Sequence, residues 1–191
     1  MENITDVMLD LETFDSKPTG AIVKISAVPF NIKTGKIFDS DIFDVSISLD
    51  SCIKAGLTVS ENTIYWWLNQ NDEARKYLMN ERKSNVSLTT ALSNFLIWFS
   101  NIKNINSIDN LYIWGNGAAF DLAMLSNAFR TIGLNPPYKP SEEQDVRTVV
   151  RRDPSIKKNM LFEGIRHNPE HDCKHQIKYV CRTINQPMNF D

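Results

Sequence analysis

Cysteine and histidine are scarce in this sequence, with three of each among 191 residues. The cysteines, Cys52, Cys173 and Cys181, are odd in number and contain no Cys-x-x-Cys pair. Small secreted domains that depend on disulfides carry a denser and even set, so the count argues against a disulfide framework. We therefore expect a protein of a reducing cytoplasm.

Long apolar runs are also lacking. No stretch approaches the roughly 20 apolar residues that a helix needs to span a bilayer. The first twelve residues, MENITDVMLDLE, are acidic and lack the basic segment of a secretory signal. We expect no membrane partner. The length, with 42% hydrophobic and 23% charged residues, predicts a single domain over residues 1–191.

The sequence also has no excess of positive charge. Its formal net charge is −2 and its isoelectric point is near 5.9. Proteins that wrap duplex nucleic acid rely on many contacts from Lys and Arg to phosphates, so this charge argues against such a role. It leaves room for an enzyme that holds a few terminal nucleotides, where bound metal ions supply positive charge.

The hydrophobic pattern changes its period along the chain. We predict strands over 5–14, 21–32, 36–49 and 110–116, and helices over 61–70, 73–81, 88–102, 118–133, 142–150 and 172–184. Three strands with short turns indicate an antiparallel meander, which the later strand joins in parallel. The expected fold class is α/β, with a mixed sheet flanked by helices.

Two acids, Asp10 and Glu12, alternate near the end of the first predicted strand. The period of two puts both on one face with Cα atoms about 6.6 Å apart, while Leu9 and Leu11 face the core. Adjacent carboxylates repel unless a cation lies between them, and a hard divalent ion is the usual partner. The alternative is a pair of solvent-facing acids on an edge strand.

Two further acids, Asp121 and Asp172, lie at the starts of predicted helices. The helix dipole alone explains an acid at such a position. The combination favours a metal site, because a phosphodiester hydrolase that uses two ions about 3.5–4 Å apart needs carboxylates from several elements.

The three histidines, His167, His171 and His175, are four residues apart, which raises the possibility of a zinc site. Pro169 interrupts the spacing, since proline disfavours helix before it, so His167 belongs to a loop and the others to the next helix. A third zinc ligand is lacking unless Cys173 turns towards them. We favour His167 as a general base and keep a zinc-dependent interaction domain as an alternative.

Three short patterns carry a resemblance: Asp-Leu-Glu-Thr at 10–13, Asn-x-x-x-Phe-Asp at 116–121 and His-x-x-x-x-Asp at 167–172. In this order they resemble the three exonuclease motifs of the DnaQ-like 3′–5′ exonucleases, in the DEDDh branch. Flanking segments such as DVRT and HDCKHQI resemble the subgroup of phage exodeoxyribonuclease A, prophage exonuclease VIII and RNase AS-type exoribonucleases. The likeness covers nearly the whole chain, and a phage-encoded member would work in the host cytoplasm.

The resemblance implies a ribonuclease H-like fold, two Mg²⁺ or Mn²⁺ ions, and release of nucleoside 5′-monophosphates from a 3′ end. It also implies a role for each motif residue. Asp10 bridges both ions, Glu12 and Asp172 hold the ion that binds the attacking water, Asp121 serves the second ion, and His167 is the general base.

Six residues are candidates for binding the substrate: Thr13, Phe14, Trp66, Trp67, Asn116 and Arg147. Adjacent helical residues face different ways, so one tryptophan is expected in the core and the other at the site, unless both are core residues. In the resembling family the 3′-terminal nucleotide lies against the first motif, here near Thr13 and Phe14, and Arg147 belongs to the DVRT block.

We predict digestion of single-stranded DNA from its 3′ end. An exoribonuclease on the same scaffold and a catalytically silent nucleic-acid-binding module are the alternatives, although the intact acids and His167 argue against silence. Assembly into a homo-oligomer is a further possibility that the sequence does not decide.

Overall fold

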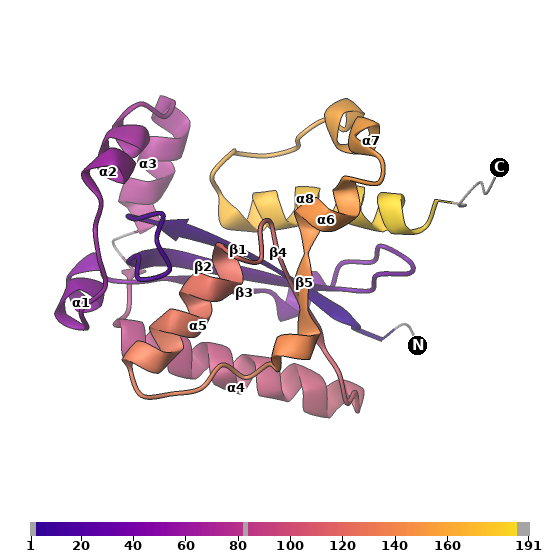
Figure 1. Ribbon diagram of the computed structural model, residues 1–191, viewed down its shortest axis with the longest axis horizontal. Helices are drawn as coiled ribbons and strands as arrows, with labels where there is room; N and C mark the ends of the chain where they lie inside the picture. Colours follow the sequence, from indigo (N-terminus) through magenta and orange to yellow (C-terminus); the bar gives the residue numbers. More distant parts are fainter. Residues whose placement is uncertain (1–2, 82–83, 187–191) are drawn as a thin grey trace.

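The computed structural model describes residues 3–81 and 84–186, which form a five-stranded mixed sheet between two layers of helices (Figure 1). The strands are β1 (Asp6–Thr13), β2 (Ile22–Phe30), β3 (Phe43–Ser46), β4 (Tyr112–Gly115) and β5 (Glu143–Asp145). Their order in the sheet is β3-β2-β1-β4-β5, with β1, β2 and β3 antiparallel and β4 and β5 parallel to β1. The predicted meander with added parallel strands is confirmed.

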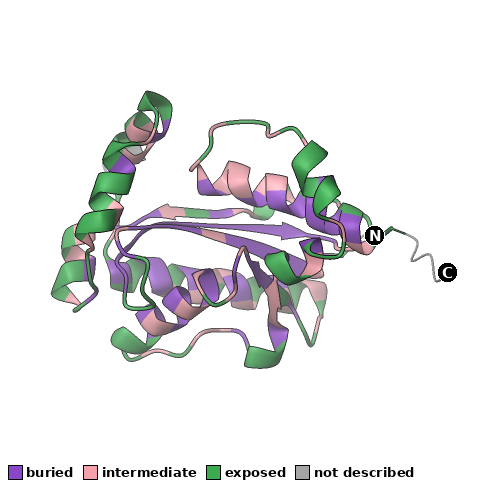
Figure 2. Cartoon of the chain, turned by 45° about the horizontal axis from the view of Figure 1, so that its top comes forward, coloured by how far each residue is buried: buried purple, intermediate pink, exposed green. Residues whose placement is uncertain are grey.

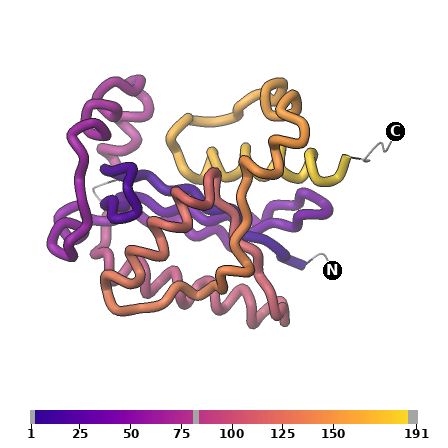
Figure 3. The backbone as a smooth tube through the Cα atoms, in the orientation of Figure 1, coloured from indigo at the N-terminus to yellow at the C-terminus, as the bar shows by residue number. Residues whose placement is uncertain are grey.

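Helices cover both faces of this sheet. They are α1 (Leu49–Lys54), α2 (Glu61–Leu68), α3 (Asp72–Glu81), α4 (Leu88–Asn106), α5 (Asp121–Thr131), α6 (Val146–Val150), α7 (Pro154–Asn159) and α8 (Pro169–Ile184). In Figures 1 and 3, α4 and α5 lie on one face, α8 with α6 and α7 on the other, and α2 and α3 at one end. None of the helices in the described parts of the chain is long and apolar enough to cross a membrane.

The predicted strand over 36–49 is wrong over most of its length. Its middle forms a short 3₁₀ helix, Asp39–Asp41, and only Phe43–Ser46 pairs as β3, apart from two isolated bridges, from Ile37 to Phe30 and from Ile47 to Val86. Asp and Ser side chains compete for backbone groups, which favours turns over strand ladders at this Asp-Ser-Asp segment.

The predicted helix over 142–150 is wrong at its start, because Glu143–Asp145 forms β5 and the helix begins at Val146. These three polar residues have no strand-like alternation, and β5 exists because β4 offers a parallel partner. The short helices α1 and α7 lay outside the predictions. Three other helices begin elsewhere than predicted: α3 at Asp72 instead of residue 73, α5 at Asp121 instead of residue 118, and α8 at Pro169 instead of residue 172.

The first residues of α8 explain its early start. Asn168 is the N-cap, and its side-chain oxygen accepts hydrogen bonds from the backbone N–H groups of Glu170 and His171. Pro169 takes the first helical position, where a missing N–H costs nothing. Asp172 therefore lies one turn inside the helix.

The strand β1 is central, and its two faces meet different cores. Val7, Leu9 and Leu11 belong to a large apolar cluster with residues of α4 and α5. Met8 faces α8 in a second cluster with Cys173. Figure 2 shows these strands as the most buried part of the chain, in contrast to the exposed surfaces of α2 and α3. Because β1 has partners on both sides, the edge-strand alternative for its acids is wrong.

Candidate active site

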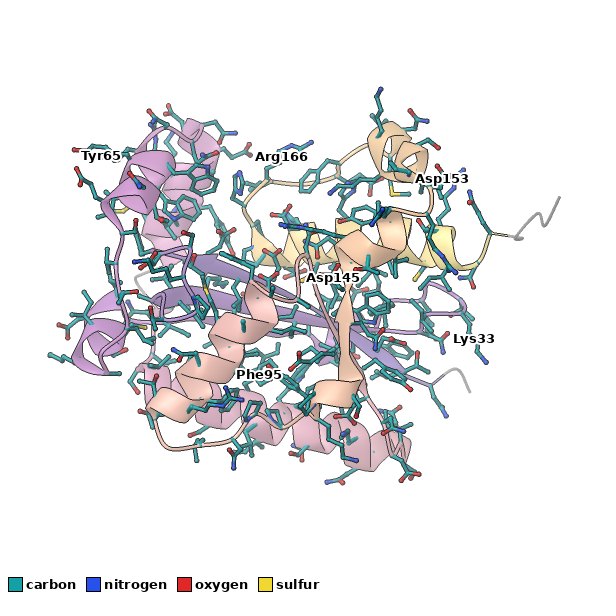
Figure 4. All side chains as sticks on the ribbon, in the orientation of Figure 1. Lys33, Tyr65, Phe95, Asp145, Asp153 and Arg166 are labelled. Carbon is teal, nitrogen blue, oxygen red and sulfur yellow. The ribbon has the colours of Figure 1, made fainter. Side chains whose placement is uncertain are left out.

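A cavity of about 580 Å³ opens where the end of β1 meets α8, α2 and the turn before α5. Tyr65 on α2 and Arg166 in the loop before α8, both labelled in Figure 4, mark the two segments that flank it. All four predicted acids and the predicted base line this cavity: Asp10, Glu12, Asp121, Asp172 and His167. The fold thus brings together residues that are up to 162 positions apart, from Asp10 to Asp172.

Asp10 and Glu12 enter the cavity from β1, on the face that looks towards α8. Burial, followed by the negative charges of Asp121 and Asp172, raises the pKa of Asp10 well above its ordinary value. Burial and then the charge of Asp10 raise the pKa of Glu12 in the same way. One donor opposes this at Asp10, since Gln176 Nε2 lies 2.9 Å from its Oδ1. The raised pKa values indicate that the carboxylates of Asp10 and Glu12 have too little positive charge near them.

Asp121 reaches the same place from the first residue of α5. The chain leaves β4 at Gly115 and turns through Gly117, whose φ of 107° suits glycine. Burial raises the pKa of Asp121 to about 7, against the lowering effect of the backbone N–H groups of Leu11 and Asn116 and of the Arg147 charge. The tight turn therefore delivers a third carboxylate to the acids of β1.

Arg147 is placed at the cavity by β5, the strand that the sequence did not predict. Asp145, at the end of β5, accepts a hydrogen bond of 2.6 Å from Ala118 N–H and one of 2.7 Å from Thr148 N–H. These bonds join the turn before α5 to the start of α6, so Arg147 lines the cavity. A Cβ at Gly117 would lie 3.0 Å from Arg147 Cζ, so the guanidinium packs directly on that turn.

Asp172 and His167 form the α8 side of the cavity. The His167 N–H donates to Asp172 Oδ2 at 2.8 Å, and His167 has a φ of 63°, in the left-handed region. That backbone conformation is strained for a residue with a Cβ, so the hydrogen bond helps to hold it. Burial raises the pKa of Asp172, although the His167 N–H and the charges of His167 and Arg166 lower it.

The donor set fits hard divalent cations. Donor atoms of Glu12, His167 and Asp172 lie within 4.8 Å of one another. Two further oxygens, Asn116 Oδ1 and Gln176 Oε1, are buried and have no hydrogen-bond partner within the described residues. Carboxylate and amide oxygens are the ligands and water acceptors that Mg²⁺ and Mn²⁺ prefer. The residues present are therefore compatible with the implied ions.

The other two histidines, His171 and His175, lie outside this cavity. His171 Nδ1 accepts a hydrogen bond of 2.9 Å from Ile165 N–H. The His175 ring lies between Phe162 and Tyr179, with centroid distances of 5.0 and 5.3 Å. Cys173 Sγ points to the sheet, 3.4 Å from the Met8 carbonyl oxygen. The arrangement offers no support for a zinc site shared by the three histidines.

The two tryptophans divide as adjacent helical positions predict. Trp67 is buried, and its Nε1 donates to the Thr13 carbonyl at 3.0 Å. Trp66 is 44% exposed and lines the cavity. The centroid of its ring lies 5.0 Å from that of His167, with the planes nearly perpendicular. Trp66 thus has a face available beside the predicted base.

The remaining predicted substrate residues are not all in one place. Thr13, Asn116 and Arg147 line the cavity, and the Thr13 hydroxyl donates to the Asp15 carbonyl at 2.9 Å. Phe14 does not line this cavity and lies instead at a second cavity of about 300 Å³ beside Lys24, so its contact with the substrate stays a prediction. The strand register shifts between Glu12 and Thr13, so simple alternation does not extend to Phe14.

Several residues of the cavity were missed by sequence reasoning: Asp15, Ser16, Asn62, Thr63 and Gln176. A usable signal exists for Gln176, which lies four residues after Asp172 and therefore on the same face of a helix. The loop residues Asp15 and Ser16 carry no comparable periodic signal.

Known proteins place this chain among nucleases. A family model described as the 3′–5′ exoribonuclease Rv2179c-like domain matches residues 5–184. The exodeoxyribonuclease of Enterobacteria phage T4 is 27% identical over 213 aligned residues, covering 97% of this chain and 92% of the phage protein.

Solved structures agree on the fold. Cell-death related nuclease 4 is 11% identical with a TM-score of 0.56, and the match covers 96% of this chain but only 64% of that protein. A full-length 3′-exonuclease is 11% identical with a TM-score of 0.60, covering 96% of this chain and 83% of that one. A 3′-exonuclease described in 3′-end-specific recognition of a histone mRNA stem-loop matches equally well.

At this identity the structures support the fold alone, and they confirm the predicted ribonuclease H-like architecture. The family model covers most of the chain and carries the activity class. This chain belongs to the Rv2179c-like family of 3′–5′ exoribonuclease domains, within the DnaQ-like 3′–5′ exonucleases.

Proposed function

We propose that this chain is a two-metal 3′–5′ exonuclease that releases nucleoside 5′-monophosphates from single-stranded DNA. The observation that carries the proposal is the meeting of four carboxylates, from β1, α5 and α8, with one histidine in a single cavity. Asp10, Glu12, Asp121 and Asp172 would hold Mg²⁺ or Mn²⁺. Such ions, when bound, lower the pKa of a coordinated water and offset the phosphate charge.

His167 is the proposed general base. It lies in the loop before α8, where its N–H donates to Asp172 and its ring packs nearly perpendicular to that of Trp66. Its imidazole takes a proton from the attacking water as the new oxygen–phosphorus bond forms. The bond from phosphorus to the 3′ oxygen of the preceding nucleotide breaks, and that oxygen leaves as the new 3′ hydroxyl after protonation. A neutral imidazole suits this task near pH 7.

Binding of the chain end is assigned to Arg147, Trp66, Thr13 and Asn116. Arg147 offers a bidentate partner for a phosphate next to the acids. The exposed ring of Trp66 can stack on a base, which contributes about 1–3 kcal/mol. Stacking needs a base that is already free, and a chain of net charge −2 is poorly suited to hold a long duplex. These properties support a preference for single strands.

The choice of DNA rests on the phage relative, which is named an exodeoxyribonuclease and aligns with this chain over 97% of its length. RNA is the second candidate, because the description of the matching family model is that of an exoribonuclease. Discrimination requires contact with the 2′ hydroxyl. Asp15, Ser16, Asn62 and Thr63 are further polar residues that line the cavity and are the positions to vary.

The test uses DNA and RNA strands of identical sequence, labelled at the 5′ end, with Mg²⁺, Mn²⁺ or EDTA. We expect a ladder that shortens from the 3′ end, faster on DNA, and no products in EDTA. Faster digestion of RNA would move the chain to the exoribonuclease function. Release of the label as a mononucleotide in the first turnovers would contradict the 3′–5′ direction.

A further inference from the structure

Gln176 is a buried residue of α8, and the nitrogen and the oxygen of its side-chain amide have different surroundings. The side chain is 4% exposed and lines the cavity. Its Nε2 donates to Asp10 Oδ1 at 2.9 Å. Its Oε1 is buried and has no partner within the described residues.

The orientation of this amide follows from its neighbour. Asp10 Oδ1 accepts the hydrogen bond, so the amide turns its N–H group to Asp10 and its oxygen away. That oxygen then needs a donor, because a buried acceptor without one is unfavourable. Water on a cation is such a donor, and the cavity beside Asp10 is where the proposed function puts cations.

An apolar residue would satisfy the packing at this position. Cys173 and Ile177, the neighbours of Gln176 on α8, belong to the apolar cluster under the helix. A side chain of similar length without polar atoms, such as Met, would avoid the unpaired oxygen. The polar side chain of Gln176 therefore indicates a function in the cavity rather than in core packing.

We propose that Gln176 is a positioning residue for cation binding, which rests on the proposed function. Its Nε2 holds Asp10 in one rotamer, with Oδ1 occupied and Oδ2 left for an ion. Its Oε1 accepts a hydrogen bond from a water on that ion. Residues that orient a metal ligand in this way typically contribute about 10- to 100-fold to metal affinity or activity.

The test compares Gln176→Met with Thr183→Val in the full chain. Thr183 is a matched control, because it is also a buried polar residue of α8, and its hydroxyl donates to the Tyr179 carbonyl at 2.8 Å. It does not line the cavity. Each metal-free protein is titrated with Mn²⁺ alone, without nucleic acid, and is then unfolded in urea with EDTA.

We expect Mn²⁺ to bind Gln176→Met roughly 10- to 100-fold more weakly than wild type. Thr183→Val should bind Mn²⁺ as wild type does, despite lower stability. Gln176→Leu is the second variant if Met loosens the helix, with the same expectation. Wild-type Mn²⁺ affinity in a folded Gln176→Met would overturn the inference and leave the proposed function standing. Failure of wild type to bind Mn²⁺ would instead remove the proposed function, and the inference with it.

Discussion

The two faces of β1 differ in what covers them. On one face Val7, Leu9 and Leu11 pack into the apolar cluster with α4 and α5. On the other face, below α8, lie Asp6, Asp10 and Glu12 together with Met8. Both faces are largely buried, so burial does not explain the difference. One face is part of the core, and the other supplies charged groups to a cavity.

The acids of the second face are themselves unequal. Asp6 accepts hydrogen bonds of 2.7 Å from Trp114 Nε1 and 2.5 Å from Thr5 Oγ1. Asp10, four residues on, accepts a hydrogen bond from Gln176 and faces the like charges of Asp121 and Asp172. A buried acid with donors is explained by the fold, whereas a buried acid among other acids requires a partner from outside the chain.

The largest expected effect comes from removing the negative charge of Asp10, compared with removing that of Asp6. Asp10→Asn should reduce hydrolysis by about 10³-fold or more, because it removes several kcal/mol of charge stabilisation at the reacting phosphate. Its metal-free stability should stay the same or rise, since repulsion with Glu12 is relieved. Asp6→Asn is the control, with lower stability and near-normal turnover. Hydrolysis rates and urea unfolding in EDTA measure both, and high activity in Asp10→Asn would refute the assignment.

The next effect separates the histidines. His167→Ala should lower turnover by roughly 10²- to 10⁴-fold, the usual contribution of a general base. His171→Ala, which loses the hydrogen bond from the Ile165 N–H and lies outside the cavity, should keep turnover close to wild type. Single-turnover rates on a labelled strand make the comparison. If His171→Ala abolished turnover and His167→Ala did not, the base would be misassigned.

A substitution on the apolar face of β1 should lower the stability of the fold and leave the hydrolysis rate of the folded protein unchanged. Leu9 is fully buried, so Leu9→Ala should lower the free energy of unfolding by about 2–5 kcal/mol. The fraction that remains folded should bind Mn²⁺ and digest nucleic acid normally. Urea unfolding and active-site-normalised rates test this, and a large rate loss in the folded fraction would show that the two faces are not separable.

A smaller effect concerns pH in the absence of metal. The folded protein holds protons on Asp121 up to a pKa of about 7, whereas the unfolded chain loses them near 3.8. Asp10 and Glu12 shift in the same direction. The folded state therefore binds more protons between these values, so stability falls as pH rises from about 4 to 7. We expect the melting temperature in EDTA to fall by roughly 5–10 °C.

Metal should reverse this trend, because cations replace the lost protons. Melting curves from pH 5 to 8, with EDTA or with Mn²⁺, check the prediction. A melting temperature in EDTA that rises steadily over this range would contradict the account of the acids.

Local patterns predicted most of the site. Alternation put Asp10 and Glu12 on one face, and Pro169 separated His167 from the helix that follows. Those inferences needed only backbone periodicity and the geometry of proline. The meander joined by a later parallel strand followed from the element pattern, and the ribonuclease H-like fold followed from the family resemblance.

What escaped prediction depends on tertiary pairing. Glu143–Asp145 become β5 only beside β4, and that strand places Arg147 in the cavity. Phe14 leaves the cavity because the register shifts at Thr13. Gln176 acquires its meaning from a contact with Asp10, 166 positions away. None of these facts is present in a local window of sequence.

The central claim is that the acids of β1, α5 and α8 are arranged for divalent ions. The most direct measurement is the number of Mn²⁺ ions bound per chain near pH 8, by titration of metal-free wild type, Asp6→Asn and Asp10→Asn. The account predicts two ions for wild type and Asp6→Asn, and fewer than two for Asp10→Asn. Equal binding by Asp10→Asn and wild type, or no binding by wild type, would contradict it.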